Sequence, residues 1–375
     1  MPFDALFVPA AIRAAVADAA WLRGMLASER ALARAEARVG LIPDVDDDVF
    51  AADGIDAAAL AEEARRAGNP VEPLVRLLRE RSQHVHHGAT SQDVLDTAAM
   101  LVAREARELV LNELDGAAAA CAALADEHRA TVMAGRTLLQ QAVPITFGLK
   151  AAEWLTGLAA ARRSLAAVAL PAQLGGAAGT LAALGTKALE VRALYARELA
   201  LAEPELSWHA LRIPIVQLGA ALAAAAAACD KIALDVVLLA QTEVGEVREG
   251  APGGSSTMPH KRNPVAGTLT RACATGAYAA AGVLLRGTHE HERAAGAWHA
   301  EWKALSDALA LTGGAAAWTR EALERIEVDP ERMRANLTPE TLSEAQRFGG
   351  AARPEDYLGA ADELIDRALA LYREP

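Results

Sequence analysis

The chain has 375 residues, a formal net charge of −12, 53% hydrophobic residues and only 4% aromatic residues. The negative charge opposes binding to a phosphate backbone, so we expect no nucleic-acid partner. Alanine and leucine dominate the apolar residues, which favours packed helices over sheets, because strands prefer β-branched and aromatic residues.

The sequence shows no signal for secretion or membrane insertion. Its first residues, Met-Pro-Phe-Asp, lack the basic and apolar regions of a signal peptide. The most apolar run, 213–229, contains Pro214 and Gln217 and is shorter than the roughly 18 to 20 residues of a spanning helix. We therefore expect a buried helix there, no membrane contact and a cytoplasmic protein. The cysteines, expected to be reduced core residues without metal-ligand spacing, are Cys121, Cys229 and Cys273.

The N-terminal part predicts an amphipathic helix that ends at Gly40 and Pro43. Its apolar residues recur at helical spacing, and Glu29 and Arg30 are expected on other faces. The apolar positions are Trp21, Leu22, Met25, Leu26 and Leu32.

A polar turn at 84–93 precedes a helical pattern that continues to about Glu127. Thr90 or Ser91 is expected to cap this helix, and the free N–H groups at its start would suit a carboxylate. Three histidines lie close together in the turn, but their spacing fits no familiar metal site. We therefore predict no metal.

Two further polar breaks and a long helix follow. The break at 135–141 precedes Pro144, and the break at 171–180 is rich in glycine. No β-branched strand precedes these glycines, so they do not indicate a dinucleotide site. The pattern from 215 to 247 predicts a helix of about 30 residues, roughly 45 Å long, which indicates an elongated bundle.

Helix packing cannot explain the segment 249–264, which combines glycines, prolines and a crowd of polar side chains. A mobile polar loop on a rigid scaffold is a common way to present catalytic groups. Asn263 and Pro264 are expected to start another long helix through about 285. The charged segment 289–302 is expected to lie in one helix, and the remainder predicts a helix, a break at Pro330 and two short helices.

Three segments carry a resemblance to a known family. Residues 254–264, Gly-Ser-Ser-Thr-Met-Pro-His-Lys-Arg-Asn-Pro, strongly resemble the signature loop of the fumarase/aspartase superfamily. Residues 88–93 resemble its first active-site segment, and 135–137 with Gln140 resemble its second. The resemblance implies a homotetramer whose active sites each combine three subunits, and addition–elimination chemistry on a succinate-like unit without a cofactor.

The same resemblance implies a mainly α fold of three regions. We expect an N-terminal helical domain over 1–92, a central long-helix bundle over 93–335, and a shortened C-terminal helical region over 336–375.

Departures from other members narrow the choice within the superfamily. Adenylosuccinate lyases carry a histidine at the position of Leu138, and a Ser-Glu pair where this chain has Gly267-Thr268. The segments 136–142, 175–185, 291–293 and 298–302 instead resemble the bacterial 3-carboxy-cis,cis-muconate cycloisomerases of protocatechuate catabolism.

Those enzymes close a tricarboxylate into 4-carboxymuconolactone by adding the substrate's own carboxylate, so a histidine acid is less necessary. Two alternatives stay open. One is a lyase of the adenylosuccinate or argininosuccinate type that releases fumarate, and the other is a helical binding protein without activity.

The resemblance assigns proton transfer at carbon to Ser255, with Ser256 as its first substitute. A serine hydroxyl is normally too weak a base for this step, so its alkoxide needs preorganised donors and positive charge, which Lys261 would supply. The residues expected to bind substrate are His86, Thr90, Ser91, Gln92, Arg136, Thr137, Gln140, Arg212, Met258, Lys261, Asn263 and Arg293.

Overall fold

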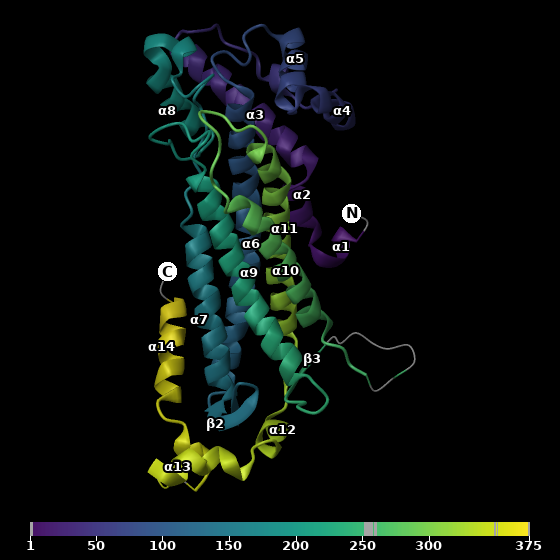
Figure 1. Ribbon diagram of the computed structural model, residues 1–375, viewed down its shortest axis with the longest axis vertical. Coiled ribbons are helices and arrows are strands. Elements are labelled where there is room, and N and C mark those ends of the chain that lie inside the picture. The colour runs from purple at the N-terminus through teal and green to yellow at the C-terminus, as the bar shows by residue number, and fades with distance from the viewer. Residues whose placement is uncertain (1–2, 251–257, 259–260, 349, 351, 374–375) are drawn as a thin grey trace.

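The computed structural model describes residues 3–250, 258, 261–348, 350 and 352–373. Helices dominate it, and the predicted mainly α fold is confirmed. The long helices run side by side along the long axis, with α4 (Ala57–Ala67) and α5 (Val71–Arg81) at one end, α1 (Asp4–Phe7) and α2 (Ala10–Ala15) beside the middle of the bundle, and a hairpin and short helices at the other end (Figure 1).

Five long helices form the bundle. Helix α10 packs on α9 and α11, and α6 packs on α7 and α11. The interior consists largely of alanine and leucine, whose good helix propensity and modest size suit long, closely packed helices. These helices are α6 (Ser91–Glu127), α7 (Phe147–Ala166), α9 (Ile213–Leu239), α10 (Val265–Leu284) and α11 (Ala297–Glu324).

The N-terminal region surrounds the start of α6 with a smaller core of its own. This core includes Leu26, Phe50 and Leu74, which pack with Leu95 of α6 and Trp298 of α11. Its elements are α1 (Asp4–Phe7), α2 (Ala10–Ala15), α3 (Asp18–Arg38), η1 (Asp47–Phe50), α4 (Ala57–Ala67) and α5 (Val71–Arg81).

Two short antiparallel strand pairs lie at the other end of the bundle. Strand β1 (Val132–Thr137) pairs with β2 (Gln140–Thr146), so the second polar break forms a β-hairpin. Strand β3 (Val247–Glu249) pairs with β4 (Ile326–Val328).

The remaining elements lie at the two ends of the bundle and, for the last helix, along its flank (Figure 1). Segments η2 (Ala182–Lys187) and α8 (Ala188–Glu198) follow α7, and α8 packs against α3. The last helix packs on α7, close to the C-terminus (Figure 1). The C-terminal elements are α12 (Pro330–Ala335), η3 (Pro339–Leu342), α13 (Ser343–Phe348), η4 (Pro354–Tyr357) and α14 (Ala361–Arg373).

Two expectations about helix boundaries are wrong. Helix α9 ends at Leu239 rather than near 247. The segment 289–302 is not one helix, because His291 and Gly296 adopt positive φ and α11 begins only at Ala297. The break expected at Pro330 is present: α11 ends at Glu324, and Pro330 begins α12, because a proline needs no N–H in the first turn of a helix.

Helix α9 contains the apolar run considered above as a membrane-like segment. One face of the helix is buried in the bundle, with Leu218, Leu222 and Ile232 in its core. Among the described residues, none of the helices has both the length and the apolar character required to cross a bilayer.

The close approach of α3 and α6 generates a stability prediction. A Cβ on Gly24 would lie 3.0 Å from both Cα and Cβ of Ala98, whereas one on Gly157 of α7 would meet nothing within 4 Å. Gly157→Ala should therefore raise the free energy of unfolding by about 0.5–1 kcal/mol through helix propensity. Gly24→Ala should lower it by ~1 kcal/mol or more through overpacking.

Urea denaturation of both variants, at one fixed protein concentration, measures these changes. Equal stabilisation by the two substitutions would show that α3 and α6 are not in this close contact.

Candidate active site

The polar turn before α6 closes onto the first turn of that helix. Thr90 is the N-cap, and its backbone N–H donates to Asp93 Oδ2 at 3.0 Å. The reciprocal bonding of these two residues forms a capping box. The prediction that Thr90 or Ser91 caps the helix is confirmed, and Ser91 is the first helical residue.

The side chain of Asp93 joins three distant segments of the chain. It is fully buried, and its Oδ1 accepts from the backbone N–H of Gly175 at 2.8 Å and lies 2.7 Å from His209 Nε2. Its Oδ2 accepts from the N–H of Gly176 at 2.9 Å as well as from Thr90. A buried carboxylate needs such partners to offset its lost hydration.

Close packing around Asp93 requires glycine at positions 175 and 176. A Cβ on Gly175 would lie 2.6 Å from the Cβ of Ser207, and one on Gly176 would lie 2.9 Å from the carbonyl oxygen of Gly88. Gly176 also has a φ of 68°, which side chains disfavour. The glycine-rich segment therefore brings its backbone amides to a carboxylate of the scaffold.

Arg212 is occupied by two carboxylates of the protein. Its guanidinium is 1% exposed, donates to both oxygens of Asp96 at 2.7 and 2.9 Å, and contacts Glu301 Oε2 at 2.6 Å. Burial lowers the pKa of Arg212, but the two carboxylates outweigh it and hold that pKa above its ordinary value. Both partners lie within the scaffold, so the contacts indicate a structural role for Arg212, and its role in substrate binding stays a prediction.

Gln92 also belongs to the scaffold. Its side chain is 1% exposed, and its Nε2 donates to the carbonyl oxygen of His209 at 2.8 Å. This contact holds the 208–212 segment against α6, and the role of Gln92 in substrate binding stays a prediction.

Of the predicted site residues at this end, the half-buried ones are His86, Thr90, Ser91 and Arg293. The guanidinium of Arg293 donates to Thr90 Oγ1 and, at 3.5 Å, to the carbonyl oxygen of Ala177. These four predicted site residues thus lie around the start of α6.

Two histidines of the polar turn pair with buried glutamates of α3. His86 Nδ1 lies 2.6 Å from Glu29 Oε1, and His87 Nδ1 lies 2.7 Å from Glu36 Oε1. Burial raises the pKa of Glu36 to about 7, against the lowering effect of His87. In the described part of the chain, no group of three or more His, Cys, Asp or Glu side chains is arranged to hold a metal ion.

Arg136 anchors the hairpin at the opposite end of the bundle. It donates to both oxygens of the fully buried Glu246, at 2.6 and 2.9 Å. Asn336 donates to the same carboxylate at 2.8 Å. The bidentate pair ties Arg136 to the scaffold, and the role of Arg136 in substrate binding stays a prediction.

The tip of the hairpin is exposed and strained. Leu138 and Leu139 have φ of 51° and 64°, and their exposed fractions are 96% and 74%. Two positive φ angles define a turn that normally uses Asn-Gly. Thr137 and Gln140 flank this tip and are exposed, so both are accessible as predicted site residues.

Glu249 connects the residues before and after the signature segment. Its carboxylate accepts from the backbone N–H groups of Ala266 at 3.0 Å and Gly267 at 2.8 Å, and these bonds hold the two ends of the segment together at the N-terminus of α10. Burial raises the pKa of the Glu249 carboxyl, although these N–H donors act in the opposite direction. Ser255 and Ser256 lie outside the described residues.

Three predicted residues of the signature segment are described. Lys261 is exposed, and its backbone N–H donates to the carbonyl oxygen of Met258 at 3.0 Å. Met258 is 41% exposed, and Asn263 is half-buried.

The predicted residues form two groups at opposite ends of one chain. Helix α6 has 37 residues, so at 1.5 Å per residue about 55 Å separates its start from the hairpin that follows it. The hairpin and the base of the signature segment both lie at the lower end in Figure 1, and the start of α6 lies at the upper end.

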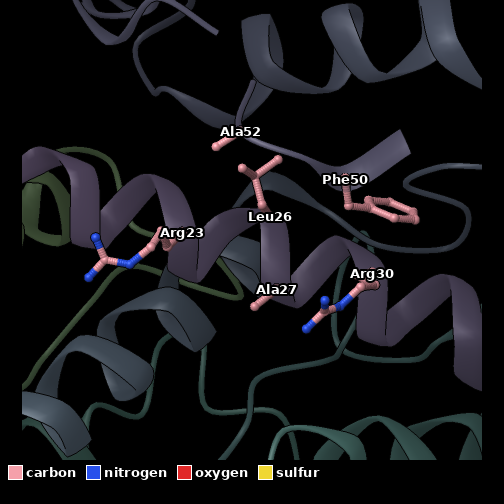
Figure 2. A pocket seen from close by; sticks show the side chains of 6 residues that line it. All are labelled: Arg23, Leu26, Ala27, Arg30, Phe50 and Ala52. Carbon is pink, nitrogen blue, oxygen red and sulfur yellow. The ribbon is translucent and has the colours of Figure 1, made fainter. Parts of the chain in front are cut away.

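A separate hollow lies on the N-terminal region. Its lining combines Leu26, Ala27 and two arginines of α3 with residues near η1, and it contains none of the predicted site residues. Figure 2 shows Leu26 directed towards Ala52, whereas Arg23 and Arg30 extend away from Phe50 and Ala52. The hollow offers no carboxylate, histidine or nucleophile for catalysis.

Comparison with known proteins identifies the family. Residues 10–277 match a family described as lyase. The chain belongs to this family, within the fumarase/aspartase superfamily.

Named relatives within the superfamily cover most of the chain. A nitrosuccinate lyase from Streptomyces davaonensis is 48% identical over 87% of this chain and 74% of its own length. A 3-carboxy-cis,cis-muconate cycloisomerase from Bradyrhizobium diazoefficiens is 47% identical over 96% of this chain and 84% of its own length. The crystal structure of 3-carboxy-cis,cis-muconate lactonizing enzyme from Pseudomonas putida superposes with a TM-score of 0.90 at 35% identity, covering 99% and 98% of the two chains.

Sequence motifs did not identify the buried glutamates that hold the motif segments in place. Glu29 was expected on another face of its helix from the apolar residues, but it is fully buried. Its position gives a signal, because Met25, Glu29, Leu32 and Glu36 recur at spacings of three and four and therefore share one face. Glu249 and Glu246 gave no comparable signal, since their partners are distant in the sequence.

The two possible roles of Arg212 make different predictions. Arg212→Gln leaves Asp96 and Glu301 without their buried counter-charge, and we expect it to lower the free energy of unfolding by about 3–5 kcal/mol. Arg65→Gln is the control, because the surface pair of Arg65 with Glu62 contributes ~0–1 kcal/mol.

Denaturant midpoints of both variants at one protein concentration provide the measurement. Unchanged stability of Arg212→Gln, together with a raised KM, would restore Arg212 as a substrate ligand.

Proposed function

We propose that this chain is a cycloisomerase that converts 3-carboxy-cis,cis-muconate to 4-carboxymuconolactone in protocatechuate (β-ketoadipate) catabolism. The observation that carries the proposal is the match to enzymes of that name over nearly the whole chain, in both sequence and structure. The exposed hairpin tip adds a chemical argument.

The hairpin tip has an apolar side chain, Leu138, where a histidine acid would stand in an adenylosuccinate lyase. Lactone formation needs no acid for a leaving group. A carboxylate oxygen of the substrate attacks the diene and the C–O bond forms, while the displaced electron pair moves towards the carbon beside another carboxylate. That carbon then takes one proton, and in the reverse direction a carboxylate leaves as a stable anion.

A substrate with three carboxylates requires cations. The pairing of Arg136 and Arg212 with buried carboxylates leaves His86, Lys261 and Arg293 as the cations for the substrate. In this proposal Thr90, Ser91, Thr137, Gln140, Met258 and Asn263 complete the binding site.

We assign proton transfer at carbon to Ser255. The fixed base of the signature segment at Glu249 supports this role, because a catalytic loop needs a defined start and end. Lys261 would stabilise the negative charge on the serine oxygen.

The separation of the two residue groups supports a shared active site. A distance of about 55 Å along α6 excludes a single site that uses both ends of one chain. We propose a homotetramer in which different subunits supply these groups. Small exposed residues on two bundle helices would allow close packing of a second copy, and they are Ala220, Ala224 and Ala227 on α9 and Ala272, Ala279 and Gly282 on α10.

We also propose a cytoplasmic location. All three cysteines are free and buried, and burial raises the pKa of each thiol, so they remain unreactive core residues.

Elimination of nitrite from nitrosuccinate is the second candidate function. It is favoured by the nitrosuccinate lyase from Streptomyces davaonensis, which is as similar in sequence as the cycloisomerase relative. Nitrite also leaves as a stable anion, so the absence of an acid at Leu138 is compatible with this reaction. Amine leaving groups need a proton, which disfavours the adenylosuccinate and argininosuccinate alternatives.

A substrate panel tests the proposal. Purified protein should decrease the ultraviolet absorbance of 3-carboxymuconate as the diene is consumed, with 4-carboxymuconolactone as the product. Parallel reactions with nitrosuccinate, adenylosuccinate and argininosuccinate should release little nitrite or fumarate. Faster release of nitrite than loss of the diene would replace the first function with the second.

Substitution of the two serines tests the assignment of the base. Ser255→Ala should lower kcat by at least about 10²- to 10⁴-fold, because it removes the group that transfers the proton. Ser256→Ala is the matched control and should retain most activity. Circular dichroism and gel filtration check that helicity and assembly are unchanged, and a reversed ranking would assign the base to Ser256.

A further inference from the structure

We propose that Glu29 is a positioning residue that orients His86 towards a substrate carboxylate, an inference that rests on the proposed function. None of the sequence motifs includes Glu29, which lies in the middle of α3.

Both carboxylate oxygens of Glu29 contact a single residue, His86. Oε1 lies 2.6 Å from His86 Nδ1, and Oε2 accepts from the His86 backbone N–H at 3.0 Å. The carboxylate is fully buried, so its lost hydration is offset by this one histidine. A packing role alone would be served as well by an apolar side chain.

The same contact fixes an unusual backbone conformation. His86 has a φ of 55°, which non-glycine residues rarely adopt. The bond from its N–H to Glu29 holds the backbone while the bond at Nδ1 holds the ring. Glu29 therefore defines both the position and the rotation of the imidazole.

This arrangement leaves one ring nitrogen for a ligand. With a proton on Nδ1 directed at Glu29, Nε2 is the nitrogen that remains. Within the part of the chain that the structure describes, no hydrogen-bond partner reaches Nε2, and the His86 side chain is 14% exposed. A protonated Nε2 would donate a charge-assisted hydrogen bond to a carboxylate.

The surrounding charges favour the protonated ring. Burial lowers the pKa of His86, but the hydrogen bond and charge of Glu29, with help from Asp93 of α6, raise it above its ordinary value. Arg79 of α5 opposes this effect, whereas Glu36 of α3 also attracts the imidazolium. Carboxylate binding should thus persist to higher pH and decline as the pH rises through the pKa of His86.

The neighbouring pair provides a matched control. His87 and Glu36 have the same contact at 2.7 Å, and Glu36 is as buried as Glu29. His87 is not among the predicted substrate ligands, and its side chain is 42% exposed. Neutralising Glu36 removes a buried carboxylate that has no hydrogen bond to His86 and acts on the imidazolium only through its charge.

The experiment compares Glu29→Gln with Glu36→Gln in the full-length protein. We expect Glu29→Gln to raise KM for 3-carboxymuconate by about ten- to a hundredfold, the cost of a lost charge-assisted bond, with a smaller change in kcat. The alkaline limit of kcat/KM should move to lower pH, because the group that raises the His86 pKa is gone. Glu36→Gln should change KM by less than about threefold and move that limit less than Glu29→Gln does, because Glu36 makes no hydrogen bond to His86.

A second variant separates charge from geometry. Glu29→Asp keeps the negative charge but shortens the side chain, so KM should rise while the alkaline limit stays close to that of the parent protein. Glu29→Asp also tests the proposal if Glu29→Gln does not fold. A wild-type KM and pH profile for both Glu29 variants would overturn the proposal, as would equal losses in Glu29→Gln and Glu36→Gln with equal decreases in Tm.

Nuclear magnetic resonance provides a readout that needs no turnover. Titration of ¹³C-labelled histidines, with His86 assigned from His86→Gln, should show a lower pKa for His86 in Glu29→Gln than in the parent protein. If the parent protein leaves 3-carboxymuconate unchanged, the proposed function fails while this titration still tests the link between Glu29 and His86. An unshifted His86 titration would overturn that link.

Discussion

Two buried carboxylates in the first turns of α6 hold this end of the molecule together. Asp93 binds the glycine-rich segment, the N-cap and His209, and Asp96 binds Arg212 and the indole N–H of Trp298. Each buried charge is tolerated only while its partners remain in place. The start of α6, the 208–212 segment and the beginning of α11 are therefore ordered by the same requirement.

This network divides the polar residues into two classes. Gln92 and Arg136 lie in segments that resemble those of the superfamily, and Arg212 was predicted to bind substrate, yet each donates hydrogen bonds to the protein itself. His86 and Arg293 are the cations that we propose for the ligand, and Arg293 is not paired with a buried carboxylate but donates to Thr90 and to the carbonyl oxygen of Ala177. A site that binds a trianion gains from this division, since cations committed to buried carboxylates do not compete for the substrate.

The sequence predicted helices well where periodicity and capping agreed. Helix α6 was expected from Asp93 to about Glu127, and it begins at Ser91 because Thr90 and Asp93 form the capping box. The strands were not expected, because β3 has only three residues and pairs with a segment far along the chain. Periodicity carries no information about such distant partners.

The same limit applies to the candidate site. Motifs identified the residue types, including His86 and Thr90, but they did not indicate which charges are paired. The roles of Arg212 and Glu29 depend on contacts with residues distant in sequence, Asp96 and His86. Only the folded chain distinguishes a buried ion pair from a ligand-binding cation, because both use the same side chains.

The length of α6 has a consequence for how activity responds to dilution. If the two ends of this helix serve different sites, a separated subunit carries parts of several sites and a complete copy of none. The number of competent sites then follows the association equilibrium of the subunits, as mass action requires. Specific activity would then depend on total protein concentration. A correctly folded subunit would have no activity until it associates with other subunits.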